Sequence, residues 1–360
     1  MANYSLFSLF LFLLSIISTA WTTSEHELND DPLIRQVVSS DGVDDHMLLN
    51  KFEYQFSKFK KTYNKAYDTE EENEYRFGVF MSNLLRARRH QKLDPSAKHG
   101  ITKFFDLTPS EFHNQFLMSE TLQHPNLPNT ILNAPILSTN DLPSKIDWRD
   151  RGAVTRVKDQ GSCKASWAFS VAGIMEAVHY QRSYQLADLS VQQILDCDST
   201  CFPPNTNCDA GCDGGYTYNA LNYLSSAGGI MAEFDYPFTG TSSNPCQFDR
   251  SAVVSSVSKI FYISNKEDQI AAYVAKRNPV IVLVNSQYLQ SYKGGVSCPS
   301  QCLQAGNHGG LLVGYDAGRN WTIKNSWGTN WGEDGYFRLC KDYITCYDQV
   351  DPIALTVVAD

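Results

Sequence analysis

Residues 160–170 read QGSCKASWAFS, and they lead into an apolar stretch that continues from about Trp167 to Tyr180. An apolar stretch of this length predicts a helix in the core. Short apolar runs follow much later in the chain, at 280–285, 310–315 and 321–324, and their β-branched and aromatic residues predict strands. Helices therefore come first and strands later, which predicts an α+β fold with two lobes.

The composition of the whole chain is that of a globular protein with a large core. Of its 360 residues, 42% are hydrophobic and 12% are aromatic, whereas disordered chains are charge-rich and poor in aromatics. At roughly 100–200 residues per domain, the length predicts two domains, or one domain with an extension. The formal net charge of −9 argues against nucleic acid or an anionic membrane as the main partner.

Two later motifs complete a pattern with residues 160–170. They are Asn307-His308-Gly309 and, at 324–328, KNSWG. Together the three segments resemble the papain family of cysteine proteases. The resemblance implies a papain-like two-lobed domain at 142–360, with a helical left lobe at about 142–250 and a β-barrel-like right lobe at about 251–360. It implies no metal or cofactor, and we expect a monomer.

The part of the chain before residue 142 resembles the inhibitory propeptide of cathepsin-F-like plant members of this family. Between Phe52 and Phe80, aromatic residues recur at three- and four-residue steps, which indicates an amphipathic helical region. The residues that match the propeptide signature and the short motif after it are Glu72, Arg76, Phe80, Asn83, Ala87, Gln91, Gly100, Thr102, Phe104 and Asp106. We expect a propeptide at 21–141, with an inhibitor domain at about 52–117 that binds the following domain. A Pro-containing stretch near 125–135 predicts an exposed linker.

The resemblance assigns a role to each polar residue of the three motifs. Gln160 takes the oxyanion position, His308 the base, and Asn325 orients the histidine. At the nucleophile position the family has cysteine, and this chain has Ser166. The two residues before it, usually Gly-Ser in the family, are Lys164 and Ala165.

A serine changes the chemistry of such a site. A thiol beside a histidine can be held as a thiolate, whereas an alcohol is too weak an acid to form that ion pair. Serine enzymes use a buried carboxylate behind the histidine, and here the third member is the neutral Asn325. We therefore expect peptidase activity to be absent or very low. Ser166 could also be only the N-cap of the helix that follows, a role that serine fills well.

Three functional classes remain open at this point. The first is a pseudoprotease that binds peptides or proteins in a retained groove. The second is an active enzyme, either a slow serine-type hydrolase or an acid/base catalyst that uses His308 and the oxyanion site on a small molecule, as in plant specialised metabolism. The third is a storage or defence protein. Retention of Gln160, His308 and Asn325 favours the second class, and the Lys164-Ala165-Ser166 cluster favours the first.

A glycine pair indicates where an extended peptide would bind. The resemblance makes Gly214 and Gly215 the loop whose backbone pairs with a peptide, because glycine allows close backbone approach; a plain turn is the alternative. The further groove residues that it implies are Tyr216, Thr217, Leu283, Gly306, Trp327 and Lys164. Lys164 would project toward the groove and change what the groove accepts.

The N-terminus and the cysteines predict export. The first twenty residues contain an apolar run followed by Ser18-Thr19-Ala20, which is typical of a secretory signal peptide; a buried helix is the alternative. All ten cysteines lie between Cys163 and Cys346, an even number that predicts five disulfides rather than a zinc site. The family resemblance implies Cys163–Cys212, Cys197–Cys246 and Cys298–Cys346, with the remaining cysteines paired as Cys201–Cys208 and Cys302–Cys340.

Two further motifs concern the route through the secretory pathway. Asn320-Trp321-Thr322 is a glycosylation sequon in an exported protein. Residues 31–35, DPLIR, look similar to the vacuolar sorting determinant of plant relatives. We therefore expect a vacuolar, lysosome-like or extracellular destination.

Overall fold

The computed structural model describes residues 44–118, 132–201, 208–242, 245–264, 266–299, 306–318, 320–341 and 354–358. The expected signal peptide and sorting motif lie outside these residues. The chain divides into two compact units, residues 1–83 and 84–360, which are described separately. No helix in the described part of the chain is long and apolar enough to cross a membrane.

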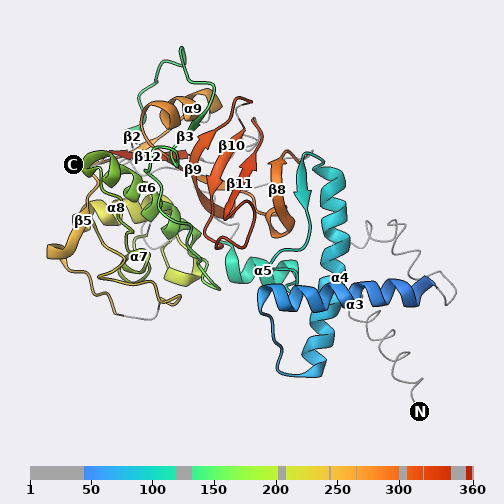
Figure 1. The fold of residues 1–360 in the computed structure, drawn as a ribbon. Coiled ribbons are helices and arrows are strands. Elements are labelled where there is room, and N and C mark those ends of the chain that lie inside the picture. The colour runs from blue at the N-terminus through green and yellow to red at the C-terminus, as the bar shows by residue number, and fades with distance from the viewer. Residues whose placement is uncertain are drawn as a thin grey trace. The chain divides into compact units, whose positions relative to one another are not determined.

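In the first unit, two helices cross each other (Figure 1), and aromatic rings pack between them. The helices are α3 (Asp44–Tyr63) and the first part of α4 (Glu70–Leu93). The ring of Phe56 lies 5.3 Å from those of Phe77 and Phe80, centroid to centroid. The predicted helical spacing is confirmed, but it is divided between two helices. Asn64, with φ 50°, follows the end of α3, and Thr69 Oγ1 accepts the Glu72 N–H at 3.1 Å at the start of α4.

The second unit contains the other helices and both sheets. Its helices are the end of α4, α5 (Pro109–Phe116), α6 (Ser166–Ser183), α7 (Val191–Cys197), α8 (Thr217–Ala227) and α9 (Glu267–Lys276), with 3₁₀ turns at Gly211–Asp213, Arg250–Ala252 and Leu289–Ser291. The apolar helix predicted from about Trp167 to Tyr180 is confirmed as α6. It is apolar on all sides because it is buried over its first thirteen residues, from Ser166 to Val178.

The strands form one large sheet and one small sheet. They are β1 (Ala97–His99), β2 (Leu132–Asn133), β3 (Ile146–Asp147), β4 (Ile230–Met231), β5 (Val253–Ser255), β6 (Lys259–Tyr262), β7 (Val280–Val284), β8 (Tyr292–Ser297), β9 (His308–Tyr315), β10 (Trp321–Lys324), β11 (Tyr336–Leu339) and β12 (Ala354–Val358). The large sheet has the order β1-β8-β11-β10-β9-β7-β12-β6-β2, with β3 also paired to β9, and β4 pairs with β5. The three predicted strands are confirmed as β7, β9 and β10.

The α+β class and the papain-like architecture are confirmed. However, the large sheet is an open path in the described part of the chain rather than a closed barrel. Both of its edge strands come from the segment before residue 142: β1 pairs antiparallel with β8, and β2 pairs parallel with β6, so this segment is part of the sheet. The lobe and domain boundaries stay predictions.

The N-terminus of α6 packs directly on β9, and glycine permits this contact (Figure 1). A Cβ at Gly309 would lie 2.8 Å from the Ser166 carbonyl oxygen, and one at Gly310 would lie 2.6 Å from an Ile323 methyl group. A larger residue at position 309 would push α6 away from β9, and one at position 310 would collide with the neighbouring strand β10. The close approach brings Ser166 beside the first residues of β9, which begins with His308.

Disulfides fix the loops around α6 and α7. The structure contains Cys163–Cys212, Cys197–Cys246 and Cys201–Cys208. The cysteines between 197 and 212 are therefore bonded to each other or to neighbouring loops and are not available to zinc. The expected pairs Cys298–Cys346 and Cys302–Cys340 each include a cysteine outside the described residues.

Candidate active site

Ser166 is the first residue of α6, and the structure rules out its role as an N-cap. The N-cap is Ala165, which makes no capping hydrogen bond with its side chain. Ser166 is fully buried, and its Oγ accepts a hydrogen bond from the Gly309 N–H at 3.1 Å. The hydroxyl oxygen therefore bonds to the backbone of the neighbouring strand β9 rather than to the first turn of its own helix.

His308 and Asn325 are bonded to each other in a fixed orientation. Asn325 Oδ1 accepts the Ser326 N–H at 2.7 Å and also lies 2.7 Å from His308 Nε2. Since this oxygen can only accept, Nε2 carries the hydrogen and Nδ1 holds the lone pair. Nδ1 is buried and has no hydrogen-bond partner among the described residues. Burial lowers the pKa of His308 to about 4, against a smaller raising effect of the bond to Asn325, so the ring is neutral near neutral pH.

Gln160 is held at both ends of its side-chain amide. Its Oε1 accepts the Ser326 hydroxyl at 2.6 Å, and its Nε2 donates to the Cys163 carbonyl at 2.6 Å and to the Phe116 carbonyl at 3.0 Å. Sequence reasoning missed the part played by Ser326. Its position beside Asn325 in the KNSWG motif was the available signal.

The Phe116 carbonyl belongs to the segment that precedes residue 142, and this segment lies across the site. The Met118 N–H donates to the Asn307 carbonyl at 3.0 Å. The rings of Phe104 and Phe112 lie 5.2 and 5.3 Å from that of Trp327, which itself lies 4.5 Å from the His308 ring. This segment therefore contacts Asn307, directly before His308, and Trp327, whose ring packs on the His308 ring.

Further contacts anchor the same segment to the turn before β8. Thr102 Oγ1 donates to the Gln290 carbonyl at 2.5 Å, and Gln290 Nε2 donates to the Leu107 carbonyl at 2.9 Å. Lys103 Nζ lies 2.7 Å from Asp159 Oδ2, one residue before Gln160. The segment is thus held at the sheet, beside Gln160 and over Trp327.

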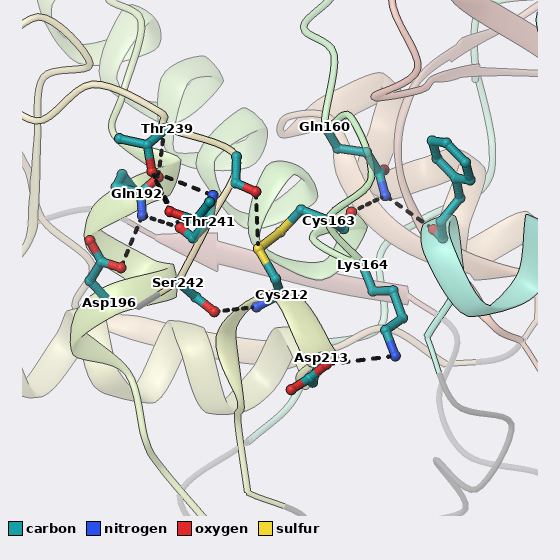
Figure 2. Close-up of a disulfide and its surroundings, with 12 residues drawn as sticks. Gln160, Cys163, Lys164, Gln192, Asp196, Cys212, Asp213, Thr239, Thr241 and Ser242 are labelled. Atoms are coloured by element: carbon teal, nitrogen blue, oxygen red, sulfur yellow. Dashed lines mark hydrogen bonds and ion pairs between the residues drawn. A yellow bond between two sulfur atoms is a disulfide. The ribbon is translucent and has the colours of Figure 1, made fainter. Parts of the chain in front are cut away.

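The predicted groove loop lies at the start of α6, next to the Cys163–Cys212 disulfide (Figure 2). A Cβ at Gly215 would lie 2.6 Å from the Trp167 ring, whereas a Cβ at Gly214 would meet nothing within 4 Å. Gly215 is thus required for packing, while Gly214 has open space beside it. Lys164 Nζ lies 3.9 Å from Asp213 Oδ1, on the same side of the disulfide.

The remaining residues predicted for the groove, and the sequon residue Asn320, lie in separate parts of the second unit. A Cβ at Gly306 would lie 3.0 Å from Leu283 Cβ, so these two residues are adjacent. Tyr216 and Thr217 are buried at the start of α8, and the Tyr216 N–H donates to Asp209 at 2.7 Å. The sequon residue Asn320 is partly exposed, and its Nδ2 donates to Asp316 at 3.1 Å.

Comparisons with known proteins agree with this arrangement. A family profile described as papain family cysteine protease matches residues 142–354, and the cathepsin propeptide inhibitor domain (I29) matches residues 56–112. The chain is 47% identical to cysteine proteinase 15A of Pisum sativum over 98% of this chain and 97% of that protein. It is 38% identical to cathepsin F of Mus musculus over 81% of this chain and 62% of the relative.

Solved structures show the same fold. Digestive procathepsin L 3 from the larval midgut of Tenebrio molitor is 31% identical, with a TM-score of 0.71 over 85% of this chain and 99% of that chain. Procathepsin L2 from the same source is 29% identical, with a TM-score of 0.75 over the same shares of the two chains. With the protease profile over more than half of its length and plant relatives along nearly all of it, the chain belongs to the papain family of cysteine proteases and carries that family's inhibitory propeptide domain.

Proposed function

We propose that this chain is a papain-family pseudoprotease that binds a peptide or protein in its groove and does not hydrolyse it. The observation that carries the proposal is the pairing of Ser166. Its Oγ accepts from the Gly309 N–H, while His308 Nδ1, the atom that would remove its proton, has no partner among the described residues. In this proposal Ser166 stands where the family has its nucleophilic cysteine.

The electrostatics of the site support the absence of turnover. In a cysteine protease the nucleophile is already ionised, as the thiolate of a thiolate–imidazolium pair. An alcohol beside a neutral histidine forms no such ion pair. In this propeptide-covered form the buried histidine resists protonation, since its pKa is lowered to about 4. Its other ring nitrogen bonds to a neutral amide instead of the carboxylate that stabilises an imidazolium in serine enzymes.

Retained binding is supported by the way in which the site already holds a polypeptide. Gln160 donates to the Phe116 carbonyl, and Asn307 accepts from the Met118 N–H. These backbone contacts do not depend on the side chains of the bound segment, so a different extended peptide could use them once the propeptide has left. The relatives named as proteases act on such chains, and here we propose binding alone.

An active enzyme is the second candidate, and one observation favours it. His308 is neutral with its lone pair on Nδ1, and Ser326 orients the Gln160 amide. This is a base and a hydrogen-bond donor of the kind that acid/base catalysis on a small molecule, or slow serine-type hydrolysis, requires.

The two candidates differ in turnover. The full chain is cut once inside residues 119–131, through an inserted site for a specific protease, so that propeptide and protease-like parts are both present. It is then incubated with a library of internally quenched peptides and with tissue metabolites. We expect peptide binding without cleavage, and no change in binding in His308→Ala. Turnover that disappears in both Ser166→Ala and His308→Ala would replace the first candidate with the second.

We further propose the route by which the protein reaches its place of action. The signal peptide at residues 1–20 would direct it into the secretory pathway, and the propeptide would be separated from the domain at 142–360 by another protease. A vacuolar or lysosome-like compartment fits the papain-family propeptide and the plant relatives. Glycosylation at Asn320 would occur on the way.

A further inference from the structure

Lys164 is held at the groove by its backbone. Its N–H donates to the Cys212 carbonyl at 3.1 Å, and the preceding residue forms the Cys163–Cys212 disulfide (Figure 2). The following residue, Ala165, is fully buried, and its N–H donates to the Cys163 carbonyl at 2.8 Å. The Lys164 side chain therefore cannot leave this place by a shift of the loop.

The surroundings of Lys164 are those of the peptide-binding site. Gln160, which holds the Phe116 carbonyl, also donates to the carbonyl of Cys163, the residue directly before Lys164. Gly214 follows Cys212 by two residues, and a Cβ at this position would meet nothing within 4 Å. A ligand carbonyl on Gln160 would thus place the adjoining part of the ligand between Lys164 and the glycine loop.

The charge of Lys164 is only weakly compensated. Its ion pair with Asp213 spans 3.9 Å, and the Asp213 side chain is 88% exposed, so water competes for this contact. The Lys164 side chain is 25% exposed, so it is partly covered by its surroundings but still reaches solvent. None of the ion pairs in the described part of the chain joins Lys164 to the propeptide, whose residues 116–118 are uncharged.

We infer that Lys164 makes this groove selective for an acidic ligand, with a carboxylate of the bound peptide replacing Asp213 at the ammonium group. The inference rests on the proposed function and names the ligand class of the same site. A ligand carboxylate would be held close to the Gln160 amide, where part of its water is removed, so the charge-assisted hydrogen bond is stronger than the exposed pair that it replaces. A glutamine or lysine at that ligand position gains no such bond.

The inference is tested by competition in the full chain cut once inside residues 119–131. The probes are acetyl-Ala-Leu-X-Ala-amide with Glu, Gln or Lys at X. The propeptide part carries a fluorescent dye, and each peptide is added in increasing concentration. Fluorescence anisotropy gives the peptide concentration at which half of the propeptide is displaced. We expect the Glu peptide to displace at about one fifth of the concentration of the Gln peptide, and the Lys peptide to be weakest. The difference should shrink in 300 mM salt (~6 Å Debye length).

Variants separate Lys164 from other sources of selectivity. Lys164→Gln should abolish the preference for Glu, and Asp213→Asn, which removes the competing carboxylate, should enlarge it. Lys145→Gln, at an exposed lysine outside the groove, should leave it unchanged. Equal displacement by the three peptides, or a preference that survives in Lys164→Gln, overturns the inference and leaves the proposed function standing. Failure of every peptide to displace the propeptide overturns both.

Discussion

Ser166 begins α6 and His308 begins β9, on opposite sides of the contact between these two elements. The hydroxyl of Ser166 bonds to the backbone of Gly309 rather than to the His308 ring. Ser166 Oγ takes its hydrogen from Gly309, the residue directly after the histidine. The N–H of Gly309 is buried, so this bond also satisfies a donor that would otherwise be unpaired. The serine hydroxyl therefore stabilises the contact between α6 and β9, independently of any role in a reaction.

This duty predicts a loss of stability when the hydroxyl is removed. Ser166→Ala leaves the buried Gly309 N–H without an acceptor, which should lower the free energy of unfolding by about 1–3 kcal/mol. Urea unfolding of the full chain measures the change. Ser225→Ala, at an exposed serine of helix α8, is the matched control and should change stability by less than about 0.5 kcal/mol. Equal stability of Ser166→Ala and wild type would mean that the bond to Gly309 contributes nothing.

At the scale of elements, helix α5 connects the propeptide to the candidate site. Thr108 and Glu111 form a capping box that starts the helix, and Phe112 and Phe116 are buried on its inner face. The ring of Phe112 meets Trp327 edge to face at 5.3 Å. Because the Trp327 ring also lies 4.5 Å from the His308 ring, one residue contacts both α5 and the candidate base.

Removing the Phe112 ring from the contact between α5 and Trp327 should weaken the binding of the propeptide. Truncating a buried phenylalanine to alanine costs about 3–5 kcal/mol in a packed core. In the chain cut inside residues 119–131, Phe112→Ala should therefore weaken the binding of the propeptide part by at least about a hundredfold. Asn114→Ala, on the exposed face of α5, should bind within about twofold of wild type. An unchanged dissociation constant for Phe112→Ala would show that α5 does not hold the propeptide.

The elements differ in how far the sequence could predict them. Helix α6 is a long apolar segment, and strands β7, β9 and β10 are distinct short apolar runs, so their positions were predictable to within a few residues. The break at 64–69 was not, because it depends on one left-handed asparagine and one capping threonine. The partner of Ser166 Oγ could not be predicted either, since it follows from the spacing of a helix and a strand about 140 residues apart.

At the scale of the whole molecule, a histidine cluster lies between the propeptide and the turn before β8, and we expect it to govern the response to acid. His90 Nδ1 lies 2.8 Å from Ser291 Oγ, and the His99 ring contacts the same hydroxyl at 3.0 Å. Burial, and to a smaller extent the charges of His99, Arg86 and Arg89, lower the pKa of His90 from 6.5 to about 3 against the raising effect of Asp94. The uncharged ring of Tyr288 covers His90 on the other side, at 4.7 Å.

The lowered pKa of His90 determines whether propeptide binding strengthens or weakens as the pH falls. With the folded-state pKa below the released-state value, the bound propeptide is fully favoured above pH 6.5, and binding weakens as the pH falls from 6.5 toward about 3. The pKa of Asp94 is also lowered, by hydrogen bonds from His99, Ser297 and the Cys298 N–H that together exceed the opposing effect of burial. Asp94 stabilises the bound state above its released-state pKa, near 3.8, so its contribution is lost only below that pH, and His90 dominates from about pH 6 to pH 4.

We therefore expect the propeptide of the cut chain to bind on the order of tenfold more weakly for each pH unit lost between about pH 6 and pH 4. His90→Gln keeps a hydrogen-bonding group beside Ser291 but cannot take up a proton in this range, so its dissociation constant should stay nearly flat. His113→Gln, at a partly exposed histidine of α5, is the matched control and should retain the wild-type profile. If His90→Gln still weakened tenfold per unit, acid release would depend on the carboxylates of the propeptide instead. In either case release requires no cleavage by Ser166, because protonation alone changes the balance between the bound and released states.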